Sequence, residues 1–488
     1  MITFTLCLVA LIVGYFVYGR YIDHLFGPTT RKTPALTNPD GVDYIPLPTW
    51  KIFMIQFLNI AGLGPIFGAI MGAKFGTASF LWIVIGSIFV GSVHDYIAGM
   101  LSLRHNGASL PEIIGEYLGN SVKQFMRLFI VVLMVLVGAV FVAGPAGLLA
   151  KLTPESLDTT FWIVVVFLYY ILATLLPIDK IIGRIYPLFA LSLIFMAIAM
   201  LVMLFVIHPS MPELWDGLSN THPQADVLPI FPIMFVSIAC GAISGFHATQ
   251  SPLMARCMTS EYHGRPIFYG AMITEGIVAL IWAGAATYFY QHNGMDEANA
   301  AIIVDSITKE WLGTIGSVLA ILGVIAAPIT SGDTAFRSAR LIVADFMHFK
   351  QEKIMSRLMI CIPMFMAAIG LLLYSLKDAD GFNMIWRYFA WANQTLSVFT
   401  LWALTVYLFK NKKNYFVTLL PAVFMTTVCI SYICIAPEGF GCSHEVSYGI
   451  GLGSAIVSIF LFIRWSKAMK NNPVQQVAPA AVSVEDCD

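Results

Sequence analysis

The sequence predicts an all-α membrane protein whose chain crosses the bilayer about thirteen times. Of its 488 residues, 58% are hydrophobic and only 11% are charged, whereas soluble domains are about 45–50% apolar and about 25% charged. The mean hydropathy is +0.79. The apolar residues gather in runs of about 20, the length that crosses the hydrocarbon core. A soluble globule could not cover its surface with so few charges.

Thirteen apolar segments are long enough to serve as spans. In chain order they are 2–19, 51–73, 79–103, 123–149, 160–176, 185–207, 229–257, 267–290, 313–331, 354–376, 384–409, 416–435 and 446–465. The first lacks a basic leader and a small-residue cleavage site, so it is interpreted as a retained span. The tail 471–488 is rich in Pro, Ala, Val and Gln and is expected to be disordered.

The distribution of Lys and Arg predicts the orientation of these spans. With the amino terminus outside and the carboxy terminus in the cytoplasm, 22 of the 27 Lys and Arg fall on the cytoplasmic side. This matches the positive-inside rule. The net charge of −1 gives no basic field for nucleic acid, so the expected partners are the lipid bilayer and a small solute.

The eight cysteines show no Cys-x-x-Cys spacing and no cluster with histidine, so neither a metal site nor a cofactor is expected. Cys434 and Cys442 fall near one extracytoplasmic loop, where pairing and simple packing both remain open.

Two spans are interrupted near the middle of the membrane. The second contains Gly62-Leu63-Gly64-Pro65, and the seventh contains Ser244-Gly245-Phe246-His247. Glycine and proline free backbone groups that lipid cannot satisfy, so such breaks survive where they line a cavity. Close packing of small residues is the alternative.

The two breaks lie five spans apart and enter from opposite sides, which favours an inverted repeat with two discontinuous helices. The predicted fold is therefore a LeuT-type five-plus-five core. Its organisation is expected as an additional span and linker (1–50), first repeat (51–208), second repeat (229–409), two further spans (410–470) and the tail.

Six stretches carry a family resemblance: DGVDYIP at 40–46, IAGLGPI at 60–66, GSVHDY at 91–96, SGFHATQSP at 244–252, TSGDTAFRSAR at 330–340 and WRYFAWANQ at 386–394. Together they resemble the carbon starvation CstA family of membrane transporters, and the resemblance implies that this chain is a short member. The resemblance implies import of pyruvate or short peptides across the cytoplasmic membrane of nutrient-limited bacteria.

The breaks predict a substrate site for a carboxylate. Helices that resume at Gly64-Pro65 and after His247 would direct amides and positive dipole ends inward, where each end contributes about 0.3–1 kcal/mol to a nearby anion. The candidate substrate-binding residues are Gln56, Asn59, Gly62, Gly64, Ser244, Gly245, His247, Gln250 and Ser251. Helix–helix hydrogen bonding is the alternative role for the amides and Ser251, and a satisfied interior histidine the alternative for His247.

The ninth span predicts an ion-coupling site. Thr330, Ser331 and Asp333 supply closely spaced oxygen atoms, and hydroxyls facing the carbonyls around Ala61 resemble the sodium site of LeuT-type transporters. Alternatively Asp333 exchanges a proton, or pairs with Arg337 one turn on. The sequence leaves Na⁺ and H⁺ both open.

Three other acidic or imidazole groups lie inside spans. Glu275 in the eighth span is a second candidate for a proton relay, because intramembrane acids are costly and usually functional. The pair His94-Asp95 is interpreted as a gate or a helix-end contact.

The function predicted from these features is secondary active transport of a small carboxylate or a short peptide, with proton coupling favoured and sodium coupling of another small solute as the alternative. A membrane-embedded enzyme is disfavoured because neither His-Glu-x-x-His nor Gly-x-Ser-x-Gly occurs. A channel is disfavoured because no filter-like carbonyl motif is visible, and a primary pump because there is no phosphate-binding loop.

Overall fold

The computed structural model describes residues 1–41, 43–175, 182–295, 300–347, 349, 354–377 and 381–471. These residues form helices joined by loops of varied length and contain no β-strand. The main helices are α1 (Ile2–Phe16), α2 (Tyr18–Phe26), α3 (Pro34–Thr37), α4 (Thr49–Ile60), α5 (Ala69–Ala73), α6 (Thr77–Ile85), α7 (Ser92–Arg104), α8 (Leu110–Leu118), α9 (Asn120–Leu152), α10 (Thr159–Leu175), α11 (Ile182–Ile207), α12 (Phe235–Ile238), α13 (Gly245–Ala255), α14 (Gly270–Asn293), α15 (Ala300–Met347), α16 (Ile354–Lys377), α17 (Gly381–Lys410), α18 (Phe416–Ile435) and α19 (His444–Asn471).

Nine of the described helical stretches are long and apolar enough to cross a membrane, and two bent helix pairs raise that number to 11. Every predicted span has a helical counterpart, but α10 is shorter than a typical span and α17 is not among the 11. The count of thirteen therefore stays a prediction. The proposed tail 471–488 lies, apart from Asn471, outside the described residues.

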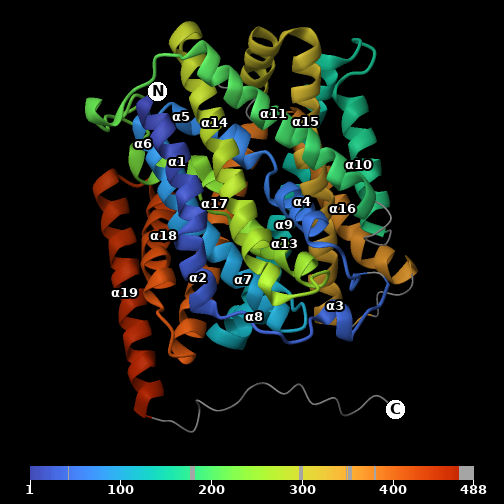
Figure 1. Ribbon diagram of the computed structural model, residues 1–488, viewed down its shortest axis with the longest axis vertical. Coiled ribbons are helices and arrows are strands. Elements are labelled where there is room, and N and C mark those ends of the chain that lie inside the picture. The colour runs from blue at the N-terminus through green and yellow to red at the C-terminus, as the bar shows by residue number, and fades with distance from the viewer. Residues whose placement is uncertain are drawn as a thin grey trace.

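The long helices form one bundle and run roughly along the long axis of the molecule (Figure 1). The span that contains α14 lies at the centre, with 89% of its most apolar stretch buried, whereas the corresponding value for α19 is 22%. Helix α19 packs against α18 at one edge of the bundle.

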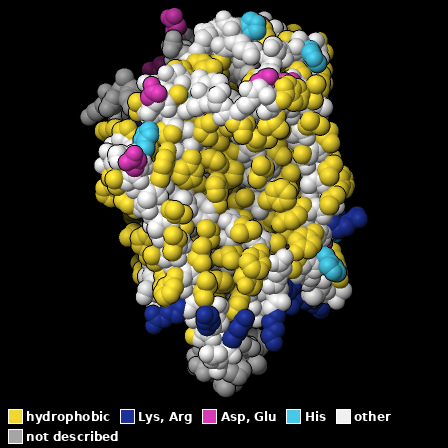
Figure 2. Space-filling view, turned by 90° about the vertical axis from the view of Figure 1, so that its left-hand side faces the viewer, with side chains coloured by type: hydrophobic (Ala, Val, Ile, Leu, Met, Phe, Trp, Pro, Cys, Tyr) yellow, Lys and Arg dark blue, Asp and Glu magenta, His cyan; other side chains and the backbone are white. Residues whose placement is uncertain are grey.

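The surface of the bundle is divided by chemistry. On the face in Figure 2 a broad hydrophobic band covers the middle, Lys and Arg side chains gather toward the lower end, and Asp and Glu lie near the upper end. The amino terminus lies at the upper end, and the last described helix, α19, ends at the lower one (Figure 1). A band of this kind is what a hydrocarbon environment requires.

The first break lies where the sequence predicts it. Helix α4 ends at Ile60, residues 61–63 leave the helical path, and a π-helical turn, η1 (Gly64–Gly68), leads into α5. The two parts are bent by 54°. Proline at the start of the resumed helix has no amide hydrogen to leave unsatisfied, which suits it to that position.

The second break differs from the prediction. The seventh span is a π-helical turn, η4 (Ile230–Met234), followed by α12 and a 3-10 turn, η5 (Ala239–Gly241); the chain then leaves the helix until α13 begins at Gly245. Ser244-Gly245 thus ends the break and starts the second half-helix, so the helix resumes before His247. Ala239 has φ +42°, a conformation that costs a non-glycine residue free energy and often marks a functional site.

The ninth span also differs from the predicted 313–331. Helix α15 is one long element with non-helical geometry at Gly313 (φ +65°), and its parts 300–318 and 320–347 are bent by 74°. The cluster Thr330–Arg340 therefore lies in the interior of the second part, and the sequence placed it wrongly at the end of a span.

Candidate functional site

The end of α4 at the first break is closed by α15. Ser331 Oγ lies 3.1 Å from the Leu58 carbonyl oxygen, 2.9 Å from that of Asn59 and 3.0 Å from that of Ala327. The last carbonyls of a helix have no partner within the helix. Ser331 offers its one hydroxyl hydrogen to them from a neighbouring element and ties α15 to the break.

The second break is held by an amide pair on α17. Asn393 Oδ1 accepts hydrogen bonds from the Phe246 amide at 2.7 Å and from Ser244 Oγ at 3.0 Å. Gln394 Nε2 donates to the Ile243 carbonyl at 2.8 Å. The sequence predicted that the amides at the start of the resumed helix would be available to an anion. The Phe246 amide already donates to Asn393 Oδ1, so at least this amide of α13 is occupied.

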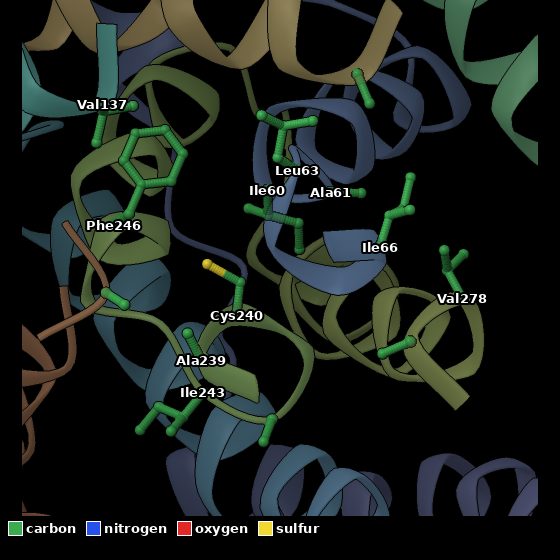
Figure 3. Packing of buried hydrophobic residues seen from close by; sticks show 14 of the residues in the cluster. Ile60, Ala61, Leu63, Ile66, Val137, Ala239, Cys240, Ile243, Phe246 and Val278 are labelled. Carbon is green, nitrogen blue, oxygen red and sulfur yellow. The ribbon is translucent and has the colours of Figure 1, made fainter. Parts of the chain in front are cut away.

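The two breaks touch each other. A Cβ atom added to Gly64 would lie 2.4 Å from Cys240 Cβ, so the chains can approach this closely only because residue 64 is glycine. Figure 3 shows Ile60, Ala61 and Leu63 of the first break beside Ala239 and Cys240 of the second. Gly62 packs against the Phe141 ring, and Gly245 packs against the backbone of α17 at Asn393 and Ser397. These glycines permit close packing, which was the alternative considered for them.

Buried amide side chains without hydrogen-bond partners lie next to the first break. Gln56 and Asn59 occupy one face of α4, are fully buried, and none of their side-chain nitrogen and oxygen atoms has a partner. Gln250 Oε1 on α13 is also unpaired. Ser251 differs, since its Oγ donates to the His247 carbonyl of its own helix at 3.0 Å. Buried polar groups are usually satisfied, so these atoms are where a polar ligand or water would find hydrogen-bond partners.

Four titratable side chains meet beside the second break. His247 is the third residue of α13, and its Nδ1 lies 2.8 Å from Asp95 Oδ2 on α7. The other oxygen of Asp95 lies 2.8 Å from Nδ1 of His94, and His247 Nε2 lies 3.3 Å from Glu275 Oε2 on α14. All four side chains are fully buried. We call these residues (His94, Asp95, His247 and Glu275) the imidazole–carboxylate cluster.

Asp333 forms a separate acidic centre. The hydroxyl of Tyr169 on α10 donates to its Oδ2 at 2.7 Å, and the hydroxyl of Tyr186 on α11 donates to its Oδ1. Arg337 binds the Ala173 carbonyl at 2.6 Å and Asp43 Oδ1 at 3.4 Å. The sequence left open an ion pair between Asp333 and Arg337. Among the described residues each of these side chains instead binds other partners.

Thr330 and Ser331 do not act as a pair. Thr330 Oγ1 bonds the carbonyls of Ala326 and Ala327 within its own helix at 3.0 and 2.8 Å, while Ser331 alone reaches α4. The carbonyls that it reaches belong to Leu58 and Asn59, one turn before Ala61. These carbonyls lie close to Ala61 along the chain, as predicted for the oxygen cluster, and the role of Thr330, Ser331 and Ala61 in ion coupling stays a prediction.

A cavity of about 410 Å³ lies at the loop end of the second break and is lined by Lys74, His222, Trp386, Arg387 and Glu438, among others. The Trp386 ring contacts Phe67 just beyond the first break at a centroid distance of 6.1 Å. Contacts continue from Trp386 through Phe389 and Phe141 to Phe246. Aromatic side chains therefore separate the cavity from the meeting point of the breaks.

Several residues of the site were not identified from sequence. Asn393 and Gln394 appeared only as part of the stretch 386–394 that resembles the family. Nothing in the sequence around Tyr169 and Tyr186 indicated a role for them. Asp95 was interpreted as a gate, yet it binds both histidines of the cluster. Cys434 and Cys442, for which pairing was open, are free thiols.

Comparison with known proteins gives the chain a family. Residues 1–156, 146–309 and 284–432 match the model described as carbon starvation protein CstA. An uncharacterized membrane protein of Haemophilus influenzae is 44% identical over 342 residues, which cover 60% of this chain and 92% of that protein. The peptide transporter CstA of Campylobacter jejuni and the pyruvate/proton symporter BtsT of Escherichia coli are each 28% identical, over 55% and 57% of this chain. The matches span about half, 47%, of the length of these two relatives.

Two solved structures have a similar arrangement of helices. A mutant of the manganese transporter of Eremococcus coleocola aligns with a TM-score of 0.59 at 13% identity, covering 88% of this chain and 98% of that one. MhsT in complex with L-phenylalanine aligns with a TM-score of 0.56 at 14% identity, covering 83% and 98%. These likenesses confirm the LeuT-type fold predicted from the two breaks. Because the family model matches most of its length, the chain belongs to the carbon starvation protein CstA family.

Proposed function

We propose that this protein is a secondary active transporter of the bacterial cytoplasmic membrane. It imports either a small carboxylate such as pyruvate or a short peptide, and each import event is coupled to proton entry. The observation that carries the proposal is the contact between two broken helices beside buried amides that have no partner. Transporters of this architecture bind substrate where discontinuous helices meet near the bilayer midplane.

The substrate class follows from what the relatives are named for and from the polar groups at the break. Peptides and pyruvate share a free carboxylate. Gln56 and Asn59 each carry an amide group that could donate hydrogen bonds to it. The cavity of about 410 Å³ has Lys74 in its lining, together with Arg387, which lies 3.6 Å from the Glu438 carboxylate. A lysine at this position suits the attraction of an anion.

The proposed orientation places the amino terminus outside and the carboxy terminus in the cytoplasm. Its support is the Lys and Arg distribution, together with the gathering of basic side chains at the lower end in Figure 2. The cavity lined by Lys74 and His222 then faces the outside, as entry of an imported solute requires.

Protons are the proposed coupling ion because titratable groups lie buried at the breaks, in the imidazole–carboxylate cluster and at Asp333. Sodium is a second candidate with its own observation. Ser331 Oγ has three carbonyl oxygens within 3.1 Å but only one hydrogen to share among them. Such an oxygen-rich position suits a hard cation.

The test is uptake by the purified full-length protein in proteoliposomes. Labelled pyruvate, lactate and dialanine are offered with an imposed inward pH gradient in sodium-free buffer, and again with a sodium gradient at equal pH. We expect accumulation of at least one acid under the pH gradient. Unlabelled acids should compete and their methyl esters should not, because an ester lacks the anionic charge. Equal competition by the ester would contradict the carboxylate assignment.

Catalysis is not part of the proposal, since the named relatives and the structural neighbours are transporters. The same vesicles check this directly. Substrate recovered from the lumen should be chemically unchanged by chromatography, and recovery of a cleaved dipeptide would overturn the transport-only assignment.

A further inference from the structure

The protonation of the imidazole–carboxylate cluster follows from its hydrogen bonds. Asp95 accepts one bond from Nδ1 of each histidine, at 2.8 Å each. A carboxylate that accepts from two N–H groups is stabilised as the anion. Both imidazoles must then carry a hydrogen on Nδ1, which leaves Nε2 of His247 directed at Glu275.

The contact between His247 Nε2 and Glu275 Oε2 requires at least one proton. Without it, two buried carboxylates would both be charged, with Glu275 Oε2 only 3.3 Å from an unprotonated Nε2. With one proton the cluster has a net charge of −1, and with a second proton it is neutral. No Lys or Arg among the described residues forms an ion pair with any of its four members. Uptake of the second proton thus removes a buried, uncompensated charge.

The cluster is connected to the moving parts that alternating access requires. His247 lies in the first turn after the second break, whereas Glu275 lies on α14. One turn beyond Glu275, Ala279 packs against Gly241 of that break, where an added Cβ would lie 2.7 Å from it. A shift of α13 relative to α14 would change the distance between Nε2 and Oε2. Substrate binding at the breaks and proton affinity would then depend on each other.

Asp333 is less suited to carry a proton. Each of its oxygens already accepts a hydrogen bond, one from Tyr169 and one from Tyr186. Both donors are tyrosines that remain neutral near pH 7, so the anion is satisfied where it stands. Glu275, by contrast, has neither oxygen in a hydrogen bond of acceptable geometry.

We propose that His247 and Glu275, with Asp95 as a fixed counter-charge, form the proton-binding site of this transporter and exchange one proton per transport cycle. The proposal rests on the proton-coupled transport proposed above and names its site. The titratable groups that face the pair are Asp95 and His94 on α7 and the thiol of Cys240 on η5. The described residues contain no group of His, Cys, Asp and Glu arranged to hold a metal ion.

The experiment compares neutralising and conservative variants of the purified full-length protein in proteoliposomes. Glu275→Gln keeps the size of the side chain and can still donate to His247 Nε2, but it cannot release a proton. Glu275→Asp keeps the acid. Asp333→Asn is the matched neutralisation of the other buried acid, and Asp305→Asn is a control outside the site. Labelled pyruvate and dialanine are the probes, and proton entry is followed with a pH-sensitive dye trapped in the lumen.

One proton per monovalent anion lets an inward gradient of one pH unit support at most about tenfold accumulation. We expect Glu275→Gln to accumulate nothing above equilibration and to admit no protons with substrate, while exchange without a gradient persists and no longer varies with pH. Glu275→Asp should regain proton entry. Asp333→Asn should slow accumulation and exchange together without altering their pH dependence.

Two results would overturn the proposal. The first is that Glu275→Gln still admits protons and accumulates substrate at the wild-type level. The second is that proton coupling is lost in Asp333→Asn alone. Either result would leave proton-coupled transport in place but would show that the proton binds elsewhere than at His247 and Glu275. If wild-type uptake of both probes follows sodium and admits no protons, the proposed coupling fails and this assignment fails with it. Size-exclusion profiles matched to wild type show that each variant is folded.

Discussion

Contact between the two breaks can be tested by filling the space at Gly64. In Gly64→Ala the new Cβ would lie 2.4 Å from Cys240 Cβ and 2.6 Å from its Sγ, while Cys240 Cα is 3.6 Å away. Favourable carbon contacts lie at about 3.5–4.0 Å, so one break must move by more than about 1 Å. Overpacking of this kind costs about 1–3 kcal/mol.

The same geometry predicts a rescue. Cys240→Gly removes both close atoms and leaves only the ordinary contact at 3.6 Å. We therefore expect the double variant to be more stable than the sum of its two single effects, with a coupling energy of about 0.5–3 kcal/mol. Thermal unfolding in detergent and pyruvate uptake are measured for the complete cycle. Gly147→Ala is the control, because an added Cβ there meets nothing within 4 Å. Additive effects of Gly64→Ala and Cys240→Gly would refute the contact.

Three further predictions concern two residues that hold the breaks, Asn393 and Ser331, and one histidine at the end of α7. Asn393→Ala should lower stability by about 1–3 kcal/mol in thermal unfolding, because two buried donors at the start of α13 lose their acceptor. Ser331→Ala should cost a similar amount by freeing the helix-end carbonyls of α4, and uptake in sodium-free buffer should survive; loss of uptake only where sodium drives it would favour the sodium alternative. At the end of α7, burial alone would lower the pKa of His105, but the Glu116 carboxylate at 3.0 Å and the Leu101 carbonyl outweigh it and raise that pKa. This contribution to stability should be present below about pH 6.5, the unfolded value, and be lost as the pH rises through the folded pKa; Glu116→Gln should flatten that pH dependence of the melting temperature.

The sequence predicted the parts of the fold that local chemistry determines. Apolar length gave the spans, and glycine with proline at residues 62–65 placed the first break correctly because both residues act on their own backbone. The second break was placed a few residues late. Its distortion centres on Ala239, whose positive φ is not evident from the residue type, whereas Ser244-Gly245 is where the helix starts again.

The candidate site was predicted only in part, because tertiary packing assembles it. Asp333 and Arg337 have the spacing of an ion pair on one helix, but tyrosines from α10 and α11 reach the acid, and Asp43 from a distant loop reaches the arginine. Asp95 and Glu275 converge on His247 from α7 and α14. No local spacing along the chain reports such a meeting.

The central claim is that the meeting of the two breaks moves an organic acid together with a proton. It is tested most directly by recording, in one population of proteoliposomes without sodium, labelled pyruvate or dialanine uptake and lumenal acidification after the acid is added outside at equal pH. We predict that inward substrate flux acidifies the lumen, that in Glu275→Gln the acidification vanishes while uptake does not exceed equilibration, and that both signals survive in Asp305→Asn. Uptake of either acid with no lumenal acidification, in the wild-type protein, would contradict the account.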